Sequence, residues 1–273
     1  MKLEYANHEF KEAKLCVLGA GYDRTSSFIP GTRLGPEYIR LCTTNIEWFS
    51  PYQDRSAGET KLCDLGDLEF ATAQPLKEIE RAVRRIYEHS KRVILLGGEH
   101  TITFPAVRAI ESLKGHFSII HFDAHADLRI ELRGEPLSHA CAIRRVSEVV
   151  GIKNIHQFGI RSGTVEEFAF HKNLHRFEVF KPLKKVLPRI KDPVYLTIDV
   201  DVLDPGAMPC VGTPEPGGIS FRELIDSLLL LKGRKILGAD IVEYNPLAAP
   251  PWASGSLAAV LLRELVLLMW GQA

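Results

Sequence analysis

The chain has 273 residues, of which 45% are hydrophobic and 25% are charged, as is usual for a globular protein. Its 34 basic residues balance 34 acidic ones, so no global field favours binding to nucleic acid or to an anionic membrane. No uncharged run of about 18 apolar residues is present, and five scattered cysteines without a CxxC pair favour a reducing compartment. We therefore expect a cytoplasmic protein with no nucleic-acid or membrane partner, folded as a single domain over residues 1–273.

Apolar, strand-like runs alternate with amphipathic, helix-like segments along most of the chain. The expected strands, in chain order, are residues 14–19, 61–65, 93–96, 117–122, 155–160, 194–200 and 235–242. The expected helices are residues 75–90, 221–231 and 254–269. Alternation of this kind predicts an α/β fold in which helices cover both faces of a mainly parallel sheet.

Two long segments rich in glycine and proline lie between these elements, at residues 26–36 and 204–218. Both are too long and too rigid in composition to be plain connectors. Long ordered loops at strand ends usually shape a pocket. We expect both loops to border a functional site.

Ionisable side chains follow four of the expected strands at the point where each strand ends. The relevant stretches are Gly97-Gly98-Glu99-His100, Asp123-Ala124-His125-Ala126-Asp127, the pair Asp199 and Asp201, and Glu243. The carboxyl ends of parallel strands meet at one edge of a sheet, where the sites of α/β proteins form. The sequence therefore predicts that these side chains converge.

Six of these residues have the chemistry of metal ligands. They are His100, Asp123, His125, Asp127, Asp199 and Asp201. Four carboxylates balance the charge of two divalent cations, whereas one cation would leave costly excess negative charge in a poorly solvated place. Mostly oxygen ligands without a thiolate favour manganese, although zinc, cobalt and iron remain compatible.

Two such cations predict metal-assisted hydrolysis. Two cations that share carboxylates can share a solvent molecule, which then ionises near neutral pH and becomes a nucleophile. The residues alone leave open whether the bond that is cleaved is a phosphoester, an amide or an amidine.

The same stretches resemble the signature blocks of the ureohydrolase family, the arginases and agmatinases. The matching blocks are LLGGEHT at 95–101, HFDAHADLR at 121–129, LTIDVDVLDP at 196–205 and ADIVEYNP at 239–246. The resemblance implies a three-layer α/β/α fold, with a binuclear manganese centre whose bridging hydroxide cleaves guanidino compounds into urea and an amine. It also implies a homo-oligomer, either a trimer or a hexamer.

The resemblance assigns the ligands by position. One Mn²⁺ would be bound by His100, Asp123, Asp127 and Asp199, and the other by Asp123, His125, Asp199 and Asp201. Asp123 and Asp199 would bridge the two ions.

The resemblance also implies roles for residues that bind no metal. Glu243 would hold the substrate, because a carboxylate is the natural bidentate partner of a planar guanidinium group. His139 would carry a proton to the leaving amine, a task that suits an imidazole. Thr213 occupies a position close to the substrate.

Within the family, residues 23–33 and 212–218 look like an agmatinase, and the loop 128–138 lacks the Asn- and Ser-rich pattern of arginases. The expected substrate is thus a small cationic guanidino compound, agmatine, cleaved to putrescine and urea. Glu131 or Glu135 could attract its distal cation.

Other functions remain as alternatives. A relative of the same reaction would act on aminopropylagmatine, guanidinobutyrate or arginine. A deacetylase-like amide hydrolase would bind one metal through fewer ligands, and a silent scaffold would not need the full set of ionisable residues.

Three further residues favour structural roles. His121 lies before the end of its strand and is expected to support a ligand rather than to be one. Asp204 precedes a proline and is expected in a turn. Cys141 is expected to be a buried apolar residue rather than a nucleophile.

Overall fold

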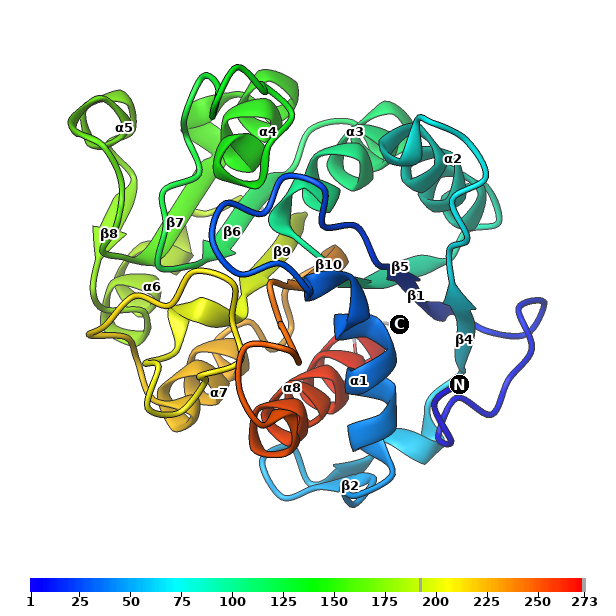
Figure 1. The fold of residues 1–273 in the computed structure, drawn as a ribbon. Helices are drawn as coiled ribbons and strands as arrows, with labels where there is room; N and C mark the ends of the chain where they lie inside the picture. The colour runs from blue at the N-terminus through cyan, green and yellow to red at the C-terminus, as the bar shows by residue number, and fades with distance from the viewer. Residues whose placement is uncertain (192, 272–273) are drawn as a thin grey trace.

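The computed structural model describes residues 1–191 and 193–271 and is built around a parallel sheet (Figure 1). In the described residues this sheet has eight strands: β1 (Leu15–Ala20), β4 (Leu62–Asp67), β5 (Arg92–Gly97), β6 (Ser118–Phe122), β7 (Ile155–Ile160), β8 (Leu174–Arg176), β9 (Val194–Asp199) and β10 (Ile236–Val242). Their order across the sheet is β4-β1-β5-β10-β9-β6-β7-β8, and every neighbouring pair is parallel. Two short strands, β2 (Phe49–Ser50) and β3 (Arg55–Ser56), form a separate antiparallel pair.

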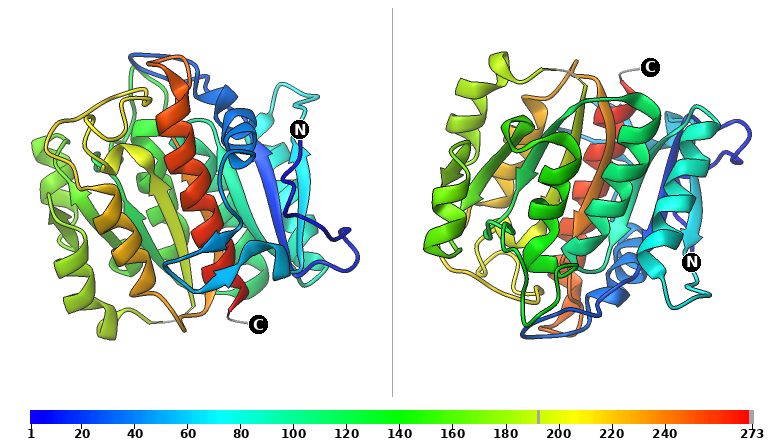
Figure 2. Two further views of the ribbon diagram at one scale, coloured as in Figure 1. Left: turned by 90° about the horizontal axis from the view of Figure 1, so that it is seen from below. Right: turned by 90° about the horizontal axis from the view of Figure 1, so that it is seen from above.

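Helices cover both faces of the sheet (Figure 2). The α-helices are α1 (Gly35–Thr43), α2 (Pro75–Glu88), α3 (Thr103–Lys114), α4 (Ala142–Val150), α5 (Val165–Phe170), α6 (Phe180–Val186), α7 (Phe221–Leu229) and α8 (Pro251–Trp270). Apolar residues of α2, α3 and α4 form one core with the sheet, and those of α1, α6, α7 and α8 form the other. The result is the three-layer α/β/α fold that the sequence predicts.

The middle strands are buried on both faces. All seven residues of β10 and all six of β9 are buried, and both strands are almost continuously apolar up to their carboxyl ends. Such runs are typical of the interior of a parallel sheet, because helices exclude water from both sides. The acidic residues at the ends of these strands are therefore held on a rigid base.

The helix α8 is apolar because it is a core helix. It is long and apolar enough to cross a membrane, yet 72% of its most apolar stretch is buried inside the fold. Its charged residues are paired within the protein: Arg263 contacts Glu264, and Glu264 accepts hydrogen bonds from Ser50 and Gln53. The helix expected over residues 254–269 is therefore present, within α8.

Every expected strand is present, and no end differs from the expected one by more than two residues. Asp199 is the last residue of β9, since Val200 already begins a short 3₁₀ turn. The segment 26–36 is only partly a loop, because a 3₁₀ turn (Thr32–Leu34) and then α1 begin within it. Pro36 in the first turn of α1 needs no hydrogen-bond partner for its nitrogen, so it starts a helix rather than preventing one.

Candidate active site

The sheet order brings the predicted site residues together. The strands β5, β10, β9 and β6 lie side by side in the middle of the sheet, although they are far apart in sequence. Their carboxyl ends carry His100, Asp123, Asp199 and Glu243, each within three residues of the end of its strand. The convergence predicted from the sequence therefore follows from topology.

A first group of ligand atoms surrounds the ring of His100. Its Nδ1 atom lies 3.1 Å from Asp123 Oδ2, 3.2 Å from Asp127 Oδ2 and 3.4 Å from Asp199 Oδ2. All four side chains are almost fully buried. This group matches the set that the resemblance assigned to one of the two ions.

A second group lies around His125. Its Nδ1 atom is 2.8 Å from Asp201 Oδ2 and 3.6 Å from Asp123 Oδ1. Asp123 thus presents one oxygen to each group. Asp199 presents Oδ2 to the first group, while its Oδ1 accepts a hydrogen bond from the backbone N–H of Asp201 at 2.8 Å.

The four buried carboxyl groups of the cluster could carry more negative charge than its two histidines could balance. Burial and then the charges of Asp201 and Asp123 raise the pKa of Asp199 well above its ordinary value. Burial alone would lower the pKa of His125, but Asp201 and Asp123 raise it to about 12. Both shifts show that the cluster attracts positive charge.

Two orphaned atoms show that divalent cations fit here. In the part of the chain that the structure describes, His100 Nδ1 and Asp201 Oδ2 are buried without a hydrogen-bond partner, although charged groups lie close to both. A buried polar atom without a partner is costly unless a ligand satisfies it. Carboxylate oxygens and imidazole nitrogens are suitable donors for manganese and similar metals, and a bound cation would take the place of the protons.

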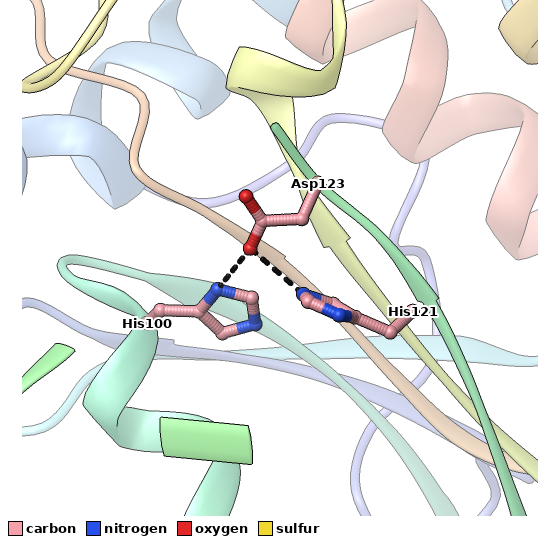
Figure 3. A group of neighbouring side chains, drawn as sticks. All are labelled: His100, His121 and Asp123. Atoms are coloured by element: carbon pink, nitrogen blue, oxygen red, sulfur yellow. Dashed lines mark hydrogen bonds and ion pairs between the residues drawn. The ribbon is translucent and has the colours of Figure 1, made fainter. Parts of the chain in front are cut away.

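The side chain of His121 contacts the carboxylate of Asp123 (Figure 3). Its Nε2 lies 2.7 Å from Asp123 Oδ2, and its Nδ1 lies 3.0 Å from the side-chain amide of Gln157. That amide also donates to Ala126 O at 2.7 Å, which fixes its orientation. His121 Nδ1 is then an acceptor and Nε2–H donates to Asp123, so His121 orients a candidate ligand.

A second buried chain of hydrogen bonds orients His100. Its Nε2 lies 2.8 Å from Thr197 Oγ1, which donates to Asp240 Oδ1 at 2.6 Å. Asp240 also accepts hydrogen bonds from Tyr195 and Thr103. Because both carboxylate oxygens of Asp240 accept hydrogen bonds, Asp240 fixes the position of Thr197 and, through it, the ring of His100.

A pocket of about 230 Å³ opens onto this cluster. It is lined by the predicted residues His125, Asp127, His139, Asp199, Thr213 and Glu243, and by Ser27, Ala126, Arg129, Leu132, Ala140, Ser162, Gly163 and Glu167. Both long loops reach it, the first through Ser27 and the second through Thr213. The expectation that these loops border the site is confirmed.

Glu243 is held at the pocket in a strained conformation. Its φ is 65°, a value that residues other than glycine rarely adopt, and Asp127 has a φ of 53°. Glu243 Oε1 accepts the backbone N–H of His100 at 2.7 Å, which connects it to the cluster of candidate ligands. Burial and then the charge of Glu99 raise the pKa of Glu243 well above its ordinary value, so a cationic partner would stabilise its charged form.

His139 lines the same pocket and lies in a short 3₁₀ turn (His139–Cys141). Thr25 and Ser27 contact its two ring nitrogens, each at 3.2 Å. Burial, and then the positive charges of His125 and His100, lower the pKa of His139 to about 4. The neutral imidazole is therefore its resting form.

Some expectations for the pocket are not met. Glu131 borders a neighbouring hollow, and Glu135 bonds to the backbone of its own loop. Glu167, which the sequence analysis did not single out, lines the pocket instead. The signal for it was the spacing Thr164-x-x-Glu167, a capping box at the start of α5.

Asp204 and Cys141, two of the three residues expected to have structural roles, do have them. Asp204 accepts the backbone N–H groups of Gly206, Gly217 and Gly218 and so fixes the second loop. Cys141 is fully buried, and burial raises the pKa of its thiol to about 11.

The site combines carboxylates and imidazoles at the carboxyl edge of a parallel sheet, beside an acidic pocket. This combination is typical of the metal-dependent hydrolases of three-layer α/β fold. Residues 13–268 match the model of the arginase family. The chain belongs to the arginase family.

Its relatives cover nearly the whole chain. It is similar to an agmatinase of Bacillus cereus, with 42% identity over 94% of this chain and 92% of the relative. It is also similar to an N(1)-aminopropylagmatine ureohydrolase of Thermococcus kodakarensis, with 39% identity over 89% of this chain and 86% of the relative. Among solved structures, the agmatine ureohydrolase of Thermoplasma volcanium superposes with a TM-score of 0.90 at 32% identity, over 98% of this chain and 94% of that one.

Proposed function

We propose that the protein is an agmatinase-type ureohydrolase that hydrolyses agmatine to putrescine and urea. The observation that carries this proposal is the placement of Glu243, a buried carboxylate at the pocket wall, next to two overlapping groups of candidate metal ligands. Relatives named as agmatinases at about 40% identity over nearly the full length support it.

We propose that six side chains hold two Mn²⁺ ions per chain: His100, Asp123, His125, Asp127, Asp199 and Asp201. When bound, the cations would lower the pKa of a water molecule so that it can act as a nucleophile near neutral pH. The chain itself keeps these ligands oriented, through His121 behind Asp123 and through Thr197 and Asp240 behind His100.

Substrate binding depends on charge and shape. The guanidinium group is planar and cationic, and a carboxylate such as Glu243 pairs with it through two parallel hydrogen bonds. When Asp127 and Asp199 bind the cations, Glu243 and Glu167 are the acidic side chains of the pocket wall that remain to attract the cationic substrate. Arg129 also lines the pocket, with Nε 3.7 Å from Glu167, and partly offsets this charge.

Proton transfer falls to His139. Cleavage of the C–N bond leaves an amine nitrogen that needs a proton before it can depart. His139 lies on the pocket wall as a neutral imidazole, able to take a proton released when water attacks and to pass it to that nitrogen. Thr213 lies on the same wall and would hold the substrate in place.

A second candidate substrate is aminopropylagmatine. The relative from Thermococcus kodakarensis is named for this longer compound and is nearly as similar to this chain as the agmatinases are. Both candidates share the guanidinium end, so they differ only in what the outer pocket must accommodate.

A urea-release assay with agmatine, aminopropylagmatine, guanidinobutyrate and arginine tests the proposal. We expect the highest kcat/KM with agmatine in Mn²⁺-loaded protein, and no urea in protein stripped of metal. Release of acetate from acetylated amines, without urea from any guanidino compound, would instead indicate an amide hydrolase.

The cellular setting is part of the same proposal. We propose that the protein acts in the cytoplasm, where agmatine hydrolysis supplies putrescine for polyamine biosynthesis, and that residues 1–273 form one domain of a homo-oligomer. Light scattering of the purified protein distinguishes a trimer or hexamer from a monomer of 30.6 kDa.

A further inference from the structure

The loop that follows β1 crosses the candidate site. Its path is fixed by backbone hydrogen bonds from Gly98 N to Ala20 O at 3.0 Å and from Glu99 N to Tyr22 O at 2.7 Å. Asp23 closes the loop by accepting the backbone N–H of Gly31 at 3.0 Å. We refer to residues 23–31 as the arch. None of its residues is a candidate metal ligand, yet it contacts His139.

Glu99 anchors the arch at Thr25. Glu99 is fully buried, and its Oε2 accepts the backbone N–H of Thr25 at 2.7 Å. Its Oε1 accepts the hydroxyl of Thr25 at 2.6 Å, and also that of Thr101 at 2.6 Å. The single proton of the Thr25 hydroxyl is thus directed at Glu99.

The other side of the same hydroxyl faces His139. Thr25 Oγ1 lies 3.0 Å from the backbone nitrogen of His139, which donates to it, and 3.2 Å from Nδ1 of the ring. A hydroxyl has one proton to donate and two lone pairs with which to accept. Because the proton is used for Glu99, the contact with Nδ1 is attractive only when Nδ1 carries a proton.

The remaining ring nitrogen is therefore left with its lone pair. His139 Nε2 lies 3.2 Å from Ser27 Oγ, whose hydroxyl can donate to it. Ser138 Oγ, 3.4 Å from Nδ1, is the only other side-chain hydroxyl within hydrogen-bond distance of that nitrogen among the described residues. If Ser138 donated to Nδ1, it would favour the tautomer with the proton on Nε2. Thr25 and Ser138 thus favour opposite tautomers of His139.

We propose that Glu99 and Thr25 form a positioning relay that holds the His139 ring with its proton on Nδ1 and leaves Nε2 as the atom that exchanges a proton with the substrate. The relay rests on the proposed function, since it assigns the proton-transfer atom of that reaction. In a Ser-His-Asp triad, a buried carboxylate bonds directly to the catalytic histidine and fixes its tautomer. Here the threonine lies between the carboxylate and the histidine.

Four variants test the relay. Thr25→Val removes the hydroxyl with little change of shape, and Thr25→Ser restores it. Thr101→Val removes a hydroxyl that bonds to the same oxygen of Glu99 without touching His139, and Ser138→Ala removes the competing hydroxyl. Thr101→Val and Ser138→Ala are the matched controls.

Two readouts are needed, because a loss of rate alone would not separate positioning from general damage. The first is the kcat and KM of urea release from pH 5 to 10. The second is the ¹⁵N spectrum of the His139 ring, assigned by comparison with His139→Asn protein and recorded both without metal and with diamagnetic Zn²⁺. This spectrum reports which ring nitrogen carries the proton and needs no turnover.

We expect wild-type protein, Thr25→Ser and both controls to show a proton on Nδ1. Thr25→Val should shift the ring toward a proton on Nε2 and lower kcat by about 10- to 100-fold, part of what general acid–base catalysis contributes. KM should change less than about threefold, since the guanidinium partner Glu243 is untouched.

Several outcomes overturn the relay. A wild-type spectrum with the proton on Nε2 would do so, even if Thr25→Val failed to fold. So would a switch of tautomer in Ser138→Ala but not in Thr25→Val, or a Thr25→Val protein with unchanged kcat. Absence of urea release by wild-type protein would refute the proposed function instead, and the tautomer would still be measured.

Discussion

At the scale of single residues, Asp123 has the most consequential position. One of its oxygens faces His100 and His121, and the other faces His125. It therefore belongs to both groups of candidate ligands, whereas Asp201 belongs only to the second. Substitutions of Asp123 and Asp201 should therefore have different effects on the metal content.

We predict that Asp123→Asn lowers metal content from two ions per chain to less than one, whereas Asp201→Asn retains about one. Metal analysis after gel filtration measures both. Asp204→Asn is the matched control, because Asp204 lies close by in sequence but bonds to the loop backbone, and it should keep two ions. Equal metal loss in the Asp123 and Asp201 variants would contradict a shared ligand.

We predict that Glu243→Gln keeps its metal but loses most of its guanidinium turnover. A glutamine side-chain oxygen can still accept the backbone N–H of His100, so the metal cluster stays in place. A charge-assisted hydrogen bond contributes about 1.5–3 kcal/mol, so kcat/KM should fall by roughly 10- to 150-fold. Urea release and metal analysis on the same sample give the answer. Full activity would remove Glu243 from the mechanism.

At the scale of secondary-structure elements, the sheet behind the site also holds buried histidines. His171, just after α5, lies 3.0 Å from the carbonyl oxygen of Ile155 at the start of β7. Burial lowers the pKa of His171 to about 4. The unfolded chain, with a histidine pKa near 6.5, binds this proton over a range in which the folded protein does not.

We predict that the free energy of unfolding falls as the pH drops from about 6.5 to about 4, because the unfolded state binds more protons there. A folded pKa below the unfolded one means that stability is present above pH 6.5 and is lost toward acid. His171→Gln, which can still donate to Ile155, should reduce this slope. Urea unfolding at several pH values measures it, and an unchanged slope would show that His171 does not contribute.

The strands in the middle of the sheet and the helices α2, α7 and α8 were readable from the sequence, whereas the helices α1, α3, α4, α5 and α6 were not predicted. The strands β5, β6, β9 and β10 are continuous apolar runs with ionisable ends, so both the strands and their convergence could be predicted. The edge strand β8 was missed because it is short and only partly buried, with His175 and Arg176 in place of an apolar alternation.

Residues that hold the loops around the pocket, but lie outside the motifs, were also missed. Arg161 donates to backbone oxygens of both the Asp201 turn and the 204–218 loop, yet one arginine in a sequence carries no sign of this. Thr25 was missed for the same reason, since its role depends on Glu99 and His139, which lie 74 and 114 residues away. Contacts between distant loops are set by the fold and leave no local pattern.

At the scale of the whole molecule, the cluster of candidate metal ligands lies where several elements meet. Its candidate ligands come from the ends of β5, β6 and β9, so bound cations would connect segments across the middle of the sheet. Anything that binds only the folded state stabilises it by mass action.

We predict that removing metal with EDTA lowers the melting temperature by several degrees. Free metal at 100 times its dissociation constant stabilises the folded state by about 2.7 kcal/mol for each site. A thermal unfolding series with added Mn²⁺ should show a rising midpoint in wild-type protein and little change in Asp123→Asn. An equal shift in both proteins would mean that the metal binds elsewhere.

The order of strands across the sheet also has a consequence for synthesis on the ribosome. The chain makes β5 and β6 early, but β10 and β9, which separate them in the sheet, come only from residues 194–242. Until that last third emerges, His100 and Asp123 have no shared edge on which to meet. We therefore expect the nascent chain to bind metal only late in synthesis. A truncated product that ends before β9 would contain four of the six candidate ligands, but they would not be assembled into a site.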